Sequence, residues 1–300
     1  MSDTTHAVST FERHRAELLA AKRAMNILAL VLFLVCLGLS IWISRFTPER
    51  LANGVPRIFE YFNTIMPQLQ WDVLFEGRNE AGRATPGSLT YWYADFWTYL
   101  QLIFETILMA ITATMLGAVA AFVLSFPAAH NLAPNRWAHW LSRRFLEICR
   151  GIPEILLALV LVFMIGIGPL AGVVAIAVHT AGALGKLFAE VNENASPRPV
   201  EGISAVGGTW VQQMLYGVVP QVTPNFTSYA LLRFEINVRA SSIIGFVGAG
   251  GIGQELNRVI SFYSDDRVLA VLIIVVLTVT VIDLISERLR LGFIGRENFA

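Results

Sequence analysis

Three charged side chains interrupt an otherwise apolar stretch in the last third of the chain: Arg233, Glu235 and Arg239. A guanidinium donates paired hydrogen bonds to the oxygens of a phosphate or phosphonate group, so these arginines are suited to bind an oxyanion. Glu235 and Arg239 are four residues apart, which places them on one helix face with the acid first. A candidate anion path therefore comprises Arg233, Glu235, Arg239, Ser241 and Ser242. The alternative is an ion pair between Glu235 and Arg239 or Arg233 that only fixes helix packing.

Other ionisable groups suggest structure rather than catalysis. His179 lies in an apolar stretch and is either a proton relay or, more commonly for a lone histidine there, a hydrogen-bonded structural group. Asp283 and Glu287 are expected to pair with Arg288 or Arg290. The sequence contains no nucleophile with a base, metal cluster or pair of acids in reach of each other. The chain is therefore predicted to be non-catalytic.

A glycine-rich segment spans residues 245–253, and its letters GAGGIG satisfy the dinucleotide fingerprint GxGxxG. No alternating strands and helices surround it, so nucleotide binding is not expected. The chain also lacks a GxxxxGK[ST] phosphate loop. Glycines allow sharp turns and close backbone approach, which suits either a gate beside a permeation path or simple helix packing. The candidate gate residues are Gly245, Gly248, Gly250, Gly251 and Gly253.

Composition indicates what must surround these residues. Hydrophobic residues make up 55% of the 300 positions and charged residues only 15%, with a formal net charge of zero. Several apolar stretches reach the roughly 20 residues that span a bilayer as a helix. The two cysteines, Cys36 and Cys149, lie far apart, so no disulfide or metal framework is expected. We predict an all-α integral membrane protein.

Six membrane helices are expected from the apolar stretches. The first, residues 25–44, follows a basic segment and is too long for a secretory signal. The charge-free run 155–185 is divided into two short spans by Gly166, Gly168 and Pro169. The spans are residues 25–44, 96–126, two within 155–185, 221–240 and 268–285. Residues 45–95 are expected to form an external loop or small cap.

Basic residues give these helices a sidedness. Arg136, Arg143, Arg144 and Arg150 surround two tryptophans in the segment 131–150, which is typical of a loop at the cytoplasmic membrane surface. The basic N-terminal segment 1–24, the loop 186–220 and the tail 289–300, with Arg296, fall on the same side. We therefore expect both termini in the cytoplasm and a core membrane domain at 96–288, with a cytoplasmic loop at 190–220.

That loop contains a narrow apolar stripe, because Val200, Ile203 and Val206 recur every third residue. A short helix with such a stripe fits a groove on a partner protein. Glu201, Gly207 and Pro220 also have the spacing of the EAA loop, so the chain resembles the permeases of binding-protein-dependent ABC importers. The resemblance implies a type I ABC importer permease fold and a helix that contacts the ATPase. The implied coupling residues are Val200, Glu201, Ile203, Ala205, Val206, Gly207 and Pro220.

Longer segments resemble the phosphonate-transport permeases in particular. They include RGIPEILLAL, YGVVPQVTPNF and RFEINVRASSIIGFVGAGGIGQEL. This resemblance favours a gate at the glycine segment and implies uptake of phosphonate or a related phosphorus oxyanion at a bacterial inner membrane. It also implies an ATP-binding subunit that carries ATP and Mg, an external binding protein, and a second permease subunit, giving a homodimer surrounded by lipid.

No cofactor on this chain and no nucleic-acid partner are expected. A stand-alone carrier or channel for small anions remains the alternative. The absence of an evident internal repeat argues against it.

Overall fold

The computed structural model describes residues 2–78, 84–262 and 266–294. Helices joined by turns account for this part, which contains no strand beyond an isolated bridge between Arg78 and Ala84. The chain divides into two compact units, residues 1–63 and 64–300. The all-α prediction is confirmed for the described residues.

The first unit consists of α1 (Ser2–Ile43) and most of α2 (Pro48–Ile65). Within α1, His14–Ile43 is long and apolar enough to cross a membrane, and its most apolar window is wholly unburied. The expected first span therefore lies inside a longer helix that also includes the N-terminal segment. α2 is amphipathic and occupies a stretch that we expected to be loop or cap.

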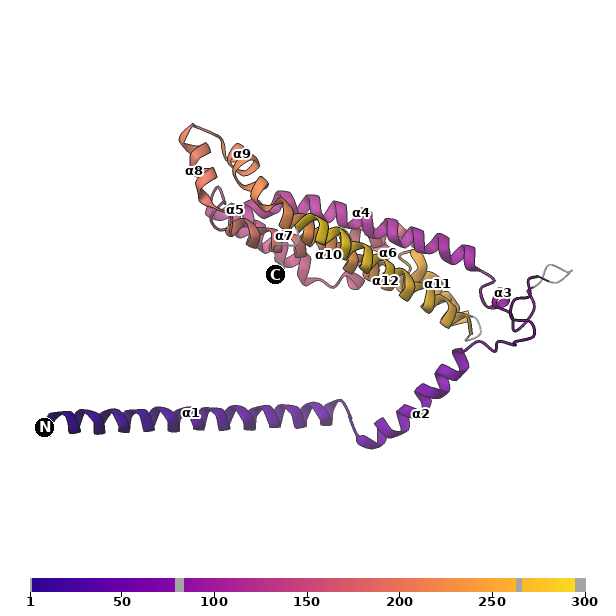
Figure 1. Cartoon of the computed structure of the whole chain (residues 1–300), viewed down its shortest axis with the longest axis horizontal. Helices are drawn as coiled ribbons and strands as arrows, with labels where there is room; N and C mark the ends of the chain where they lie inside the picture. The colour runs from indigo at the N-terminus through magenta and orange to yellow at the C-terminus, as the bar shows by residue number, and fades with distance from the viewer. Residues whose placement is uncertain (1, 79–83, 263–265, 295–300) are drawn as a thin grey trace. The chain divides into compact units, whose positions relative to one another are not determined.

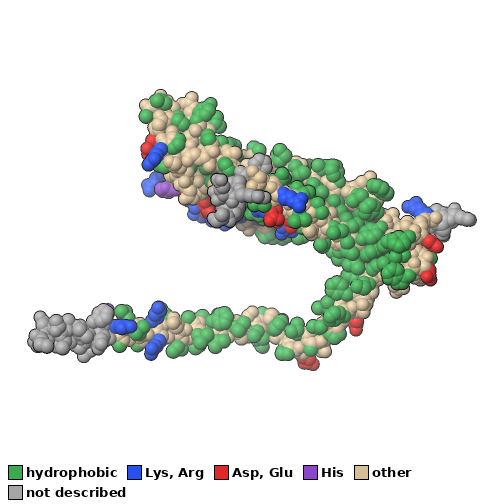
Figure 2. Space-filling view, viewed as in Figure 1, with side chains coloured by type: hydrophobic (Ala, Val, Ile, Leu, Met, Phe, Trp, Pro, Cys, Tyr) green, Lys and Arg blue, Asp and Glu red, His purple; other side chains and the backbone are tan. Residues whose placement is uncertain are grey.

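The second unit is a bundle of long helices with shorter ones at its ends (Figure 1). α4, α7, α10 and α12 run side by side along the bundle, α8 and α9 lie at one end, and α3 and α11 lie toward the other. Hydrophobic side chains cover much of its visible face (Figure 2). The helices are α3 (Leu89–Trp92), α4 (Phe96–Ala128), α5 (Arg136–Gly151), α6 (Glu154–Ile165), α7 (Pro169–Glu193), α8 (Pro197–Ala205), α9 (Trp210–Gln212), α10 (Val219–Ile244), α11 (Gly251–Phe262) and α12 (Asp266–Ile294).

The centre of the bundle is the contact between α4 and α7. Their backbones approach closely at Gly117, where an added Cβ would lie 2.9 Å from the Ala177 carbonyl oxygen and 2.6 Å from Thr180 Cγ2. Aromatic rings extend this core to α10, since Phe188 stacks on Phe226 with ring centroids 3.9 Å apart and Phe122 meets Phe226 edge-on. Small residues and rings together hold three long helices in register.

Four helices are long and apolar enough to cross a membrane: His14–Ile43, Phe96–Ala128, Pro169–Glu193 and Arg267–Gly292. α5 and α6, bent by 85° at the break between them, could form a fifth span. α10 is not among these helices. The charged residues Arg233, Glu235 and Arg239 account for that, because they lower its hydropathy. The expected fifth span is thus a helix, but an unusually polar one.

Several expected boundaries were wrong. α4 continues through Pro127 to Ala128, and α7 continues to Glu193, so residues 186–193 are helix rather than loop. The basic segment 131–150 is largely the helix α5. α6 has 12 residues and is about 18 Å long, which is too short to cross a hydrocarbon core of about 30 Å alone.

The C-terminal part also differs from expectation. The helix α11 begins within the glycine segment, at Gly251. α12 extends well beyond the expected span 268–285 at its C-terminal end. Arg288 and Arg290 lie within α12. Arg296 is outside the described residues.

Candidate functional site

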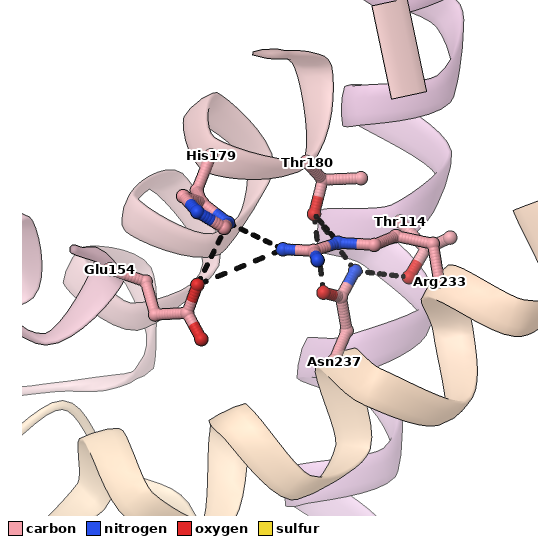
Figure 3. Close-up of polar contacts among 6 residues, drawn as sticks. All are labelled: Thr114, Glu154, His179, Thr180, Arg233 and Asn237. Atoms are coloured by element: carbon pink, nitrogen blue, oxygen red, sulfur yellow. Dashed lines mark hydrogen bonds and ion pairs between the residues drawn. The ribbon is translucent and has the colours of Figure 1, made fainter. Parts of the chain in front are cut away.

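A cluster of polar side chains lies within the bundle, where α6, α7 and α10 meet (Figure 3). Glu154 comes from the first turn of α6, His179 from the middle of α7 and Arg233 from the middle of α10. Glu154 Oε2 lies 2.8 Å from His179 Nδ1 and 3.7 Å from Arg233 Nη2. The side chains are only 26%, 17% and 12% exposed, respectively. One carboxylate therefore compensates one guanidinium in a largely buried setting.

His179 contacts both charged partners through the same nitrogen. Its Nδ1 lies within hydrogen-bond distance of Arg233 Nη2 as well as of Glu154. A neutral ring can accept from the guanidinium at that atom or donate to the carboxylate, but cannot do both at once. The structure therefore supports the expectation of a hydrogen-bonded structural histidine.

Uncharged groups extend the cluster to α4. The Asn237 amide donates to Thr114 Oγ1 over 2.8 Å and to Thr180 Oγ1 over 3.0 Å, and Arg233 Nε donates to Thr180 Oγ1 over 3.4 Å. Thr180 and Asn237 are fully buried. These bonds satisfy polar groups that would otherwise be costly in an apolar bundle.

Only His179 and Arg233 of this cluster were singled out from the sequence. Glu154 immediately precedes the charge-free run 155–185 and was given no role, while Thr180 and Asn237 carry no charge. The best available signal was that this apolar stretch contains two arginines but one glutamate, so a further counter-charge is required from elsewhere.

The predicted path residues divide into two groups. Arg233 faces Glu154 and His179, whereas Glu235 forms an ion pair with Arg239, which also lies 3.4 Å from Asp283 on α12. Glu235 and Arg239 therefore form the expected ion pair, and their role in packing or in a solute path stays a prediction. The expected partners of Asp283 were wrong. Asp283 was assigned to its sequence neighbours because the packing of α12 against α10 is not visible in sequence.

Of the two serines of the candidate path, Ser241 is buried and Ser242 is half-buried. Ser242 Oγ donates to the carbonyl oxygen of Val238 over 3.1 Å. Ser241 is fully buried, and its hydroxyl has no hydrogen-bond partner among the described residues. Any contact of these residues with a transported solute remains a prediction.

The glycine segment has a backbone that requires glycine. Gly248, Gly250 and Gly251 have φ angles of 88°, 83° and 70°, in the left-handed region that other residues rarely adopt. An added Cβ at Gly245 would lie 2.6 Å from the backbone of Gly250 and Gly253. The segment is therefore both sharply turned and closely packed, and its role as a gate stays a prediction.

Two side chains of α4 hold this segment in place. Thr106 Oγ1 accepts a hydrogen bond from the Ile252 amide over 2.9 Å, and Glu105 Oε1 lies 3.4 Å from the Gly251 amide nitrogen. These are the first amides of α11, which have no partner within that helix. α4 therefore caps α11 from outside and joins the glycine segment to the bundle.

Replacing Thr106 with Val is expected to destabilise the bundle by about 1–3 kcal/mol, because the buried Ile252 amide loses its acceptor. Thermal unfolding of the detergent-purified protein measures this. Thr106→Ser keeps the hydroxyl and is the matched control. Equal melting temperatures for the Val and Ser variants would show that the capping bond contributes nothing.

The predicted coupling residues lie at the end of the bundle formed by α8 and α9 (Figure 1). Their apolar stripe does not point outward as a whole. Val200 and Ile203 are half-buried, whereas Val206 is 84% exposed. Val200 packs closely on Gly217, where an added Cβ would lie 3.1 Å from Val200 Cγ2. The expectation of a continuous exposed stripe was therefore wrong, because the following π-helical turn Gln213–Val218 packs on α8.

The remaining predicted coupling residues are accessible. Glu201, Ala205, Gly207 and Pro220 are exposed, and Gly207 has a φ of 82° just after α8 ends. Trp210 anchors the segment by donating from Nε1 to the Leu132 carbonyl over 2.7 Å. The structure thus presents a short, fixed helix at one end of the bundle.

Comparison with known proteins gives the family. Residues 113–292 match the family described as binding-protein-dependent transport system inner membrane component. The chain belongs to this family. It is accordingly a multi-pass membrane protein and an ABC transporter permease, as the EAA-type spacing predicted.

Curated relatives agree with this assignment. The chain is 32% identical over 273 residues to the putative phosphite transport system permease protein HtxC of Stutzerimonas stutzeri, covering 90% of this chain and 88% of that protein. It is 40% identical over 170 residues to the phosphite transport system permease protein PtxC of the same species, covering 57% and 62%.

A solved structure shows the same fold. An inward-facing form of the MetNI methionine ABC transporter contains a chain that is 21% identical to this one, with a TM-score of 0.56. The match covers 67% of this chain and 98% of that chain. The ABC importer permease architecture implied by the sequence resemblance is therefore confirmed for this part.

Proposed function

We propose that this chain is the permease subunit of a bacterial ABC importer for phosphonate, phosphite or a related phosphorus oxyanion. The observation that carries the proposal is 32% identity across 90% of the chain to a protein named as a phosphite transport permease. A relative named as a putative cryptic phosphonate transport permease of Escherichia coli is 45% identical over 120 residues and supports the same substrate class.

The proposed topology has six spans with both termini in the cytoplasm. It counts the four apolar helices, the bent pair α5 and α6, and the polar helix α10. α5, with its four arginines, lies at the same end of the bundle as α8 and α9, which agrees with a cytoplasmic position for that end (Figure 1).

The proposed partners follow from the role of an importer permease. A separate ATP-binding subunit, carrying ATP and Mg, docks on α8, an external binding protein delivers the solute, and a second copy of this chain completes the path. α10 contributes Arg233, Glu235, Arg239, Ser241 and Ser242 to the path, and the glycine segment forms the gate. The charged side chains of α10 support this assignment, because a charged side chain within a membrane helix usually faces a solute path or a partner residue.

The decisive experiment reconstitutes the chain with its ATP-binding subunit in liposomes and measures ATP turnover with and without the loaded binding protein. We expect Val206→Asp to abolish most of the stimulation, because docking at the exposed Val206 would then bury an unpaired carboxylate, which is strongly unfavourable. Val211→Asp in α9, also exposed, is the matched control. Stimulation that survives replacement of the whole segment 201–207 would refute the coupling assignment.

The same liposomes test the alternative function. Uptake of phosphite or phosphonate by this chain without ATP or the ATP-binding subunit would identify a secondary carrier. Uptake that needs all components supports the importer.

A further inference from the structure

A second charged cluster lies between α10 and α12, on a different side of α10 from Arg233. Arg239 Nη2 pairs with Glu235 of its own helix and lies 3.4 Å from Asp283 Oδ2 on α12. The side chains of Arg239, Glu235 and Asp283 are 48%, 14% and 37% exposed, respectively. Two carboxylates therefore share one guanidinium, which leaves one negative charge in excess.

Packing against α4 places this cluster at mid-depth in the bundle. Ala110 of α4 packs with Val238 and Ile282, the residues that immediately precede Arg239 and Asp283. Ala110 is 14 residues from the first residue of α4 and 18 from the last, which is about 21 Å and 27 Å along the helix. α4 is long and apolar enough to cross a membrane. The cluster is therefore far from both ends of this span.

Half-exposed charges at that depth restrict what can cover this face of α10 and α12. A guanidinium or carboxylate in contact with lipid hydrocarbon is costly, so such groups face a water-filled path or a protein partner. In the assembled importer, the face that presents Arg239 and Asp283 therefore borders water or the second permease copy. Asp283 thus lies beside the proposed solute path, although it belongs to a different helix from the other path residues.

The guanidinium of Arg239 can bind an anion without leaving its two acids. Both carboxylates meet the same nitrogen, Nη2. A guanidinium has five N–H groups, and a paired contact with an oxyanion uses two of them. The other nitrogens of Arg239 can therefore donate to a phosphorus oxyanion. The two nearby carboxylates repel that anion, so it binds more weakly than it would to an arginine without acidic partners.

Asp283 is poorly placed for a purely structural ion pair. Its Oδ2 is 3.4 Å from Arg239, longer than the roughly 2.7–2.9 Å of a good charge-assisted hydrogen bond. Its Oδ1 is buried and has no hydrogen-bond partner among the described residues. A buried carboxylate oxygen without a donor is unfavourable. Glu235 already supplies a counter-charge for Arg239 from within α10, so charge balance does not require Asp283.

We propose that Asp283 is a positioning residue of the solute path, which acts through Arg239 to weaken its hold on the transported oxyanion. The inference rests on the proposed function, because it requires that a phosphorus oxyanion passes this face. A solute that binds tightly in mid-path cannot leave quickly, so conduction needs weak sites. Glu235 orients the guanidinium from within α10, and Asp283 supplies the repulsion from α12.

Equilibrium binding of radiolabelled inorganic phosphate tests this role. The full chain is reconstituted with its ATP-binding subunit in lipid nanodiscs, without ATP and without the binding protein. Asp283→Asn should bind phosphate about tenfold more tightly than the native chain, because charges about 7 Å apart still interact strongly at an effective dielectric constant of about 20. Asp283→Ser should show the same gain, whereas Asp283→Glu should keep the weak native binding. A purely structural Asp283 predicts lower stability and no gain in binding.

Two further variants identify where the phosphate binds. Glu287→Gln removes an exposed carboxylate one helical turn further along α12 and should leave the affinity at its native value, because solvent screens that charge. The triple variant Glu235→Gln, Arg239→Gln and Asp283→Asn leaves none of these charges unpaired and should abolish the gain. Unchanged binding in both Asp283→Asn and Asp283→Ser, an equal gain in Glu287→Gln, or a gain that survives in the triple variant would overturn the proposal.

The binding assay separates the role of Asp283 from the proposed importer function. ATP-driven uptake by native liposomes is measured independently, since phosphate binding needs neither ATP nor the binding protein. Native uptake together with unchanged binding in Asp283→Asn overturns only the role of Asp283. Absence of ATP-driven uptake of phosphite or phosphonate overturns the importer function and the path role with it, even where Asp283→Asn gains phosphate binding.

Discussion

Arg233→Gln is expected to lower the free energy of unfolding by about 3 kcal/mol, because it leaves the buried carboxylate of Glu154 without its cation. Arg233 is 12% exposed and Glu154 26% exposed, so water can only partly replace the lost partner. The hydrogen bonds from Arg233 to His179 and Thr180 disappear as well. The effect is therefore larger than for an ordinary surface ion pair.

Thermal unfolding in detergent measures this loss, and Arg144→Gln is the matched control. Arg144 is 56% exposed and its partner Glu147 is 34% exposed, so removing this ion pair should cost no more than about 1 kcal/mol. The double variant Glu154→Gln with Arg233→Gln should recover most of the stability, since no buried charge is then left unpaired. Equal losses of unfolding free energy in Arg233→Gln and in the control variant would show that the buried ion pair of Arg233 stabilises the protein no more than an exposed one.

The double variant also separates two roles of Arg233. A protein that regains stability and still transports phosphite would show that the cluster only holds α6, α7 and α10 together. A stable protein without uptake would support a direct contact between Arg233 and the transported anion.

Gly253→Ala is expected to destabilise the bundle by at least about 3 kcal/mol, the upper range for inserting a group into a packed core. Its Cβ would fall far inside van der Waals contact with the carbonyl oxygen of Ser242. A backbone atom cannot move aside as a flexible side chain can, so α10 and α11 must separate. The yield of folded protein and its melting temperature report this change.

Gly202→Ala is the control for that substitution. Gly202 also lies in a helix, α8, but an added Cβ there meets nothing within 4 Å. The variant should be unchanged or slightly more stable, because alanine favours helix. A Gly253→Ala protein as stable as Gly202→Ala would show that α10 and α11 are not packed as described.

The membrane class and helical content were readable from local patterns. Apolar runs of sufficient length and the placement of arginines require only neighbouring residues, so the positions of α4, α7 and α12 were close to expectation. The spacing of Glu201, Gly207 and Pro220 identified the family for the same reason. The errors lay at helix ends and in amphipathic segments such as α5, where charged residues suggested a loop although one apolar face continued.

The partners of the intramembrane charges were decided only by the tertiary structure. Arg233 is two residues from Glu235 and 79 from Glu154, yet Glu154 and His179 are its partners. The spacing of residues in the sequence predicts which face of its own helix a residue occupies, but it does not predict which other helix packs on that face. That depends on the close contacts at Gly117, Gly182 and Gly253, which set how the helices rotate and approach one another.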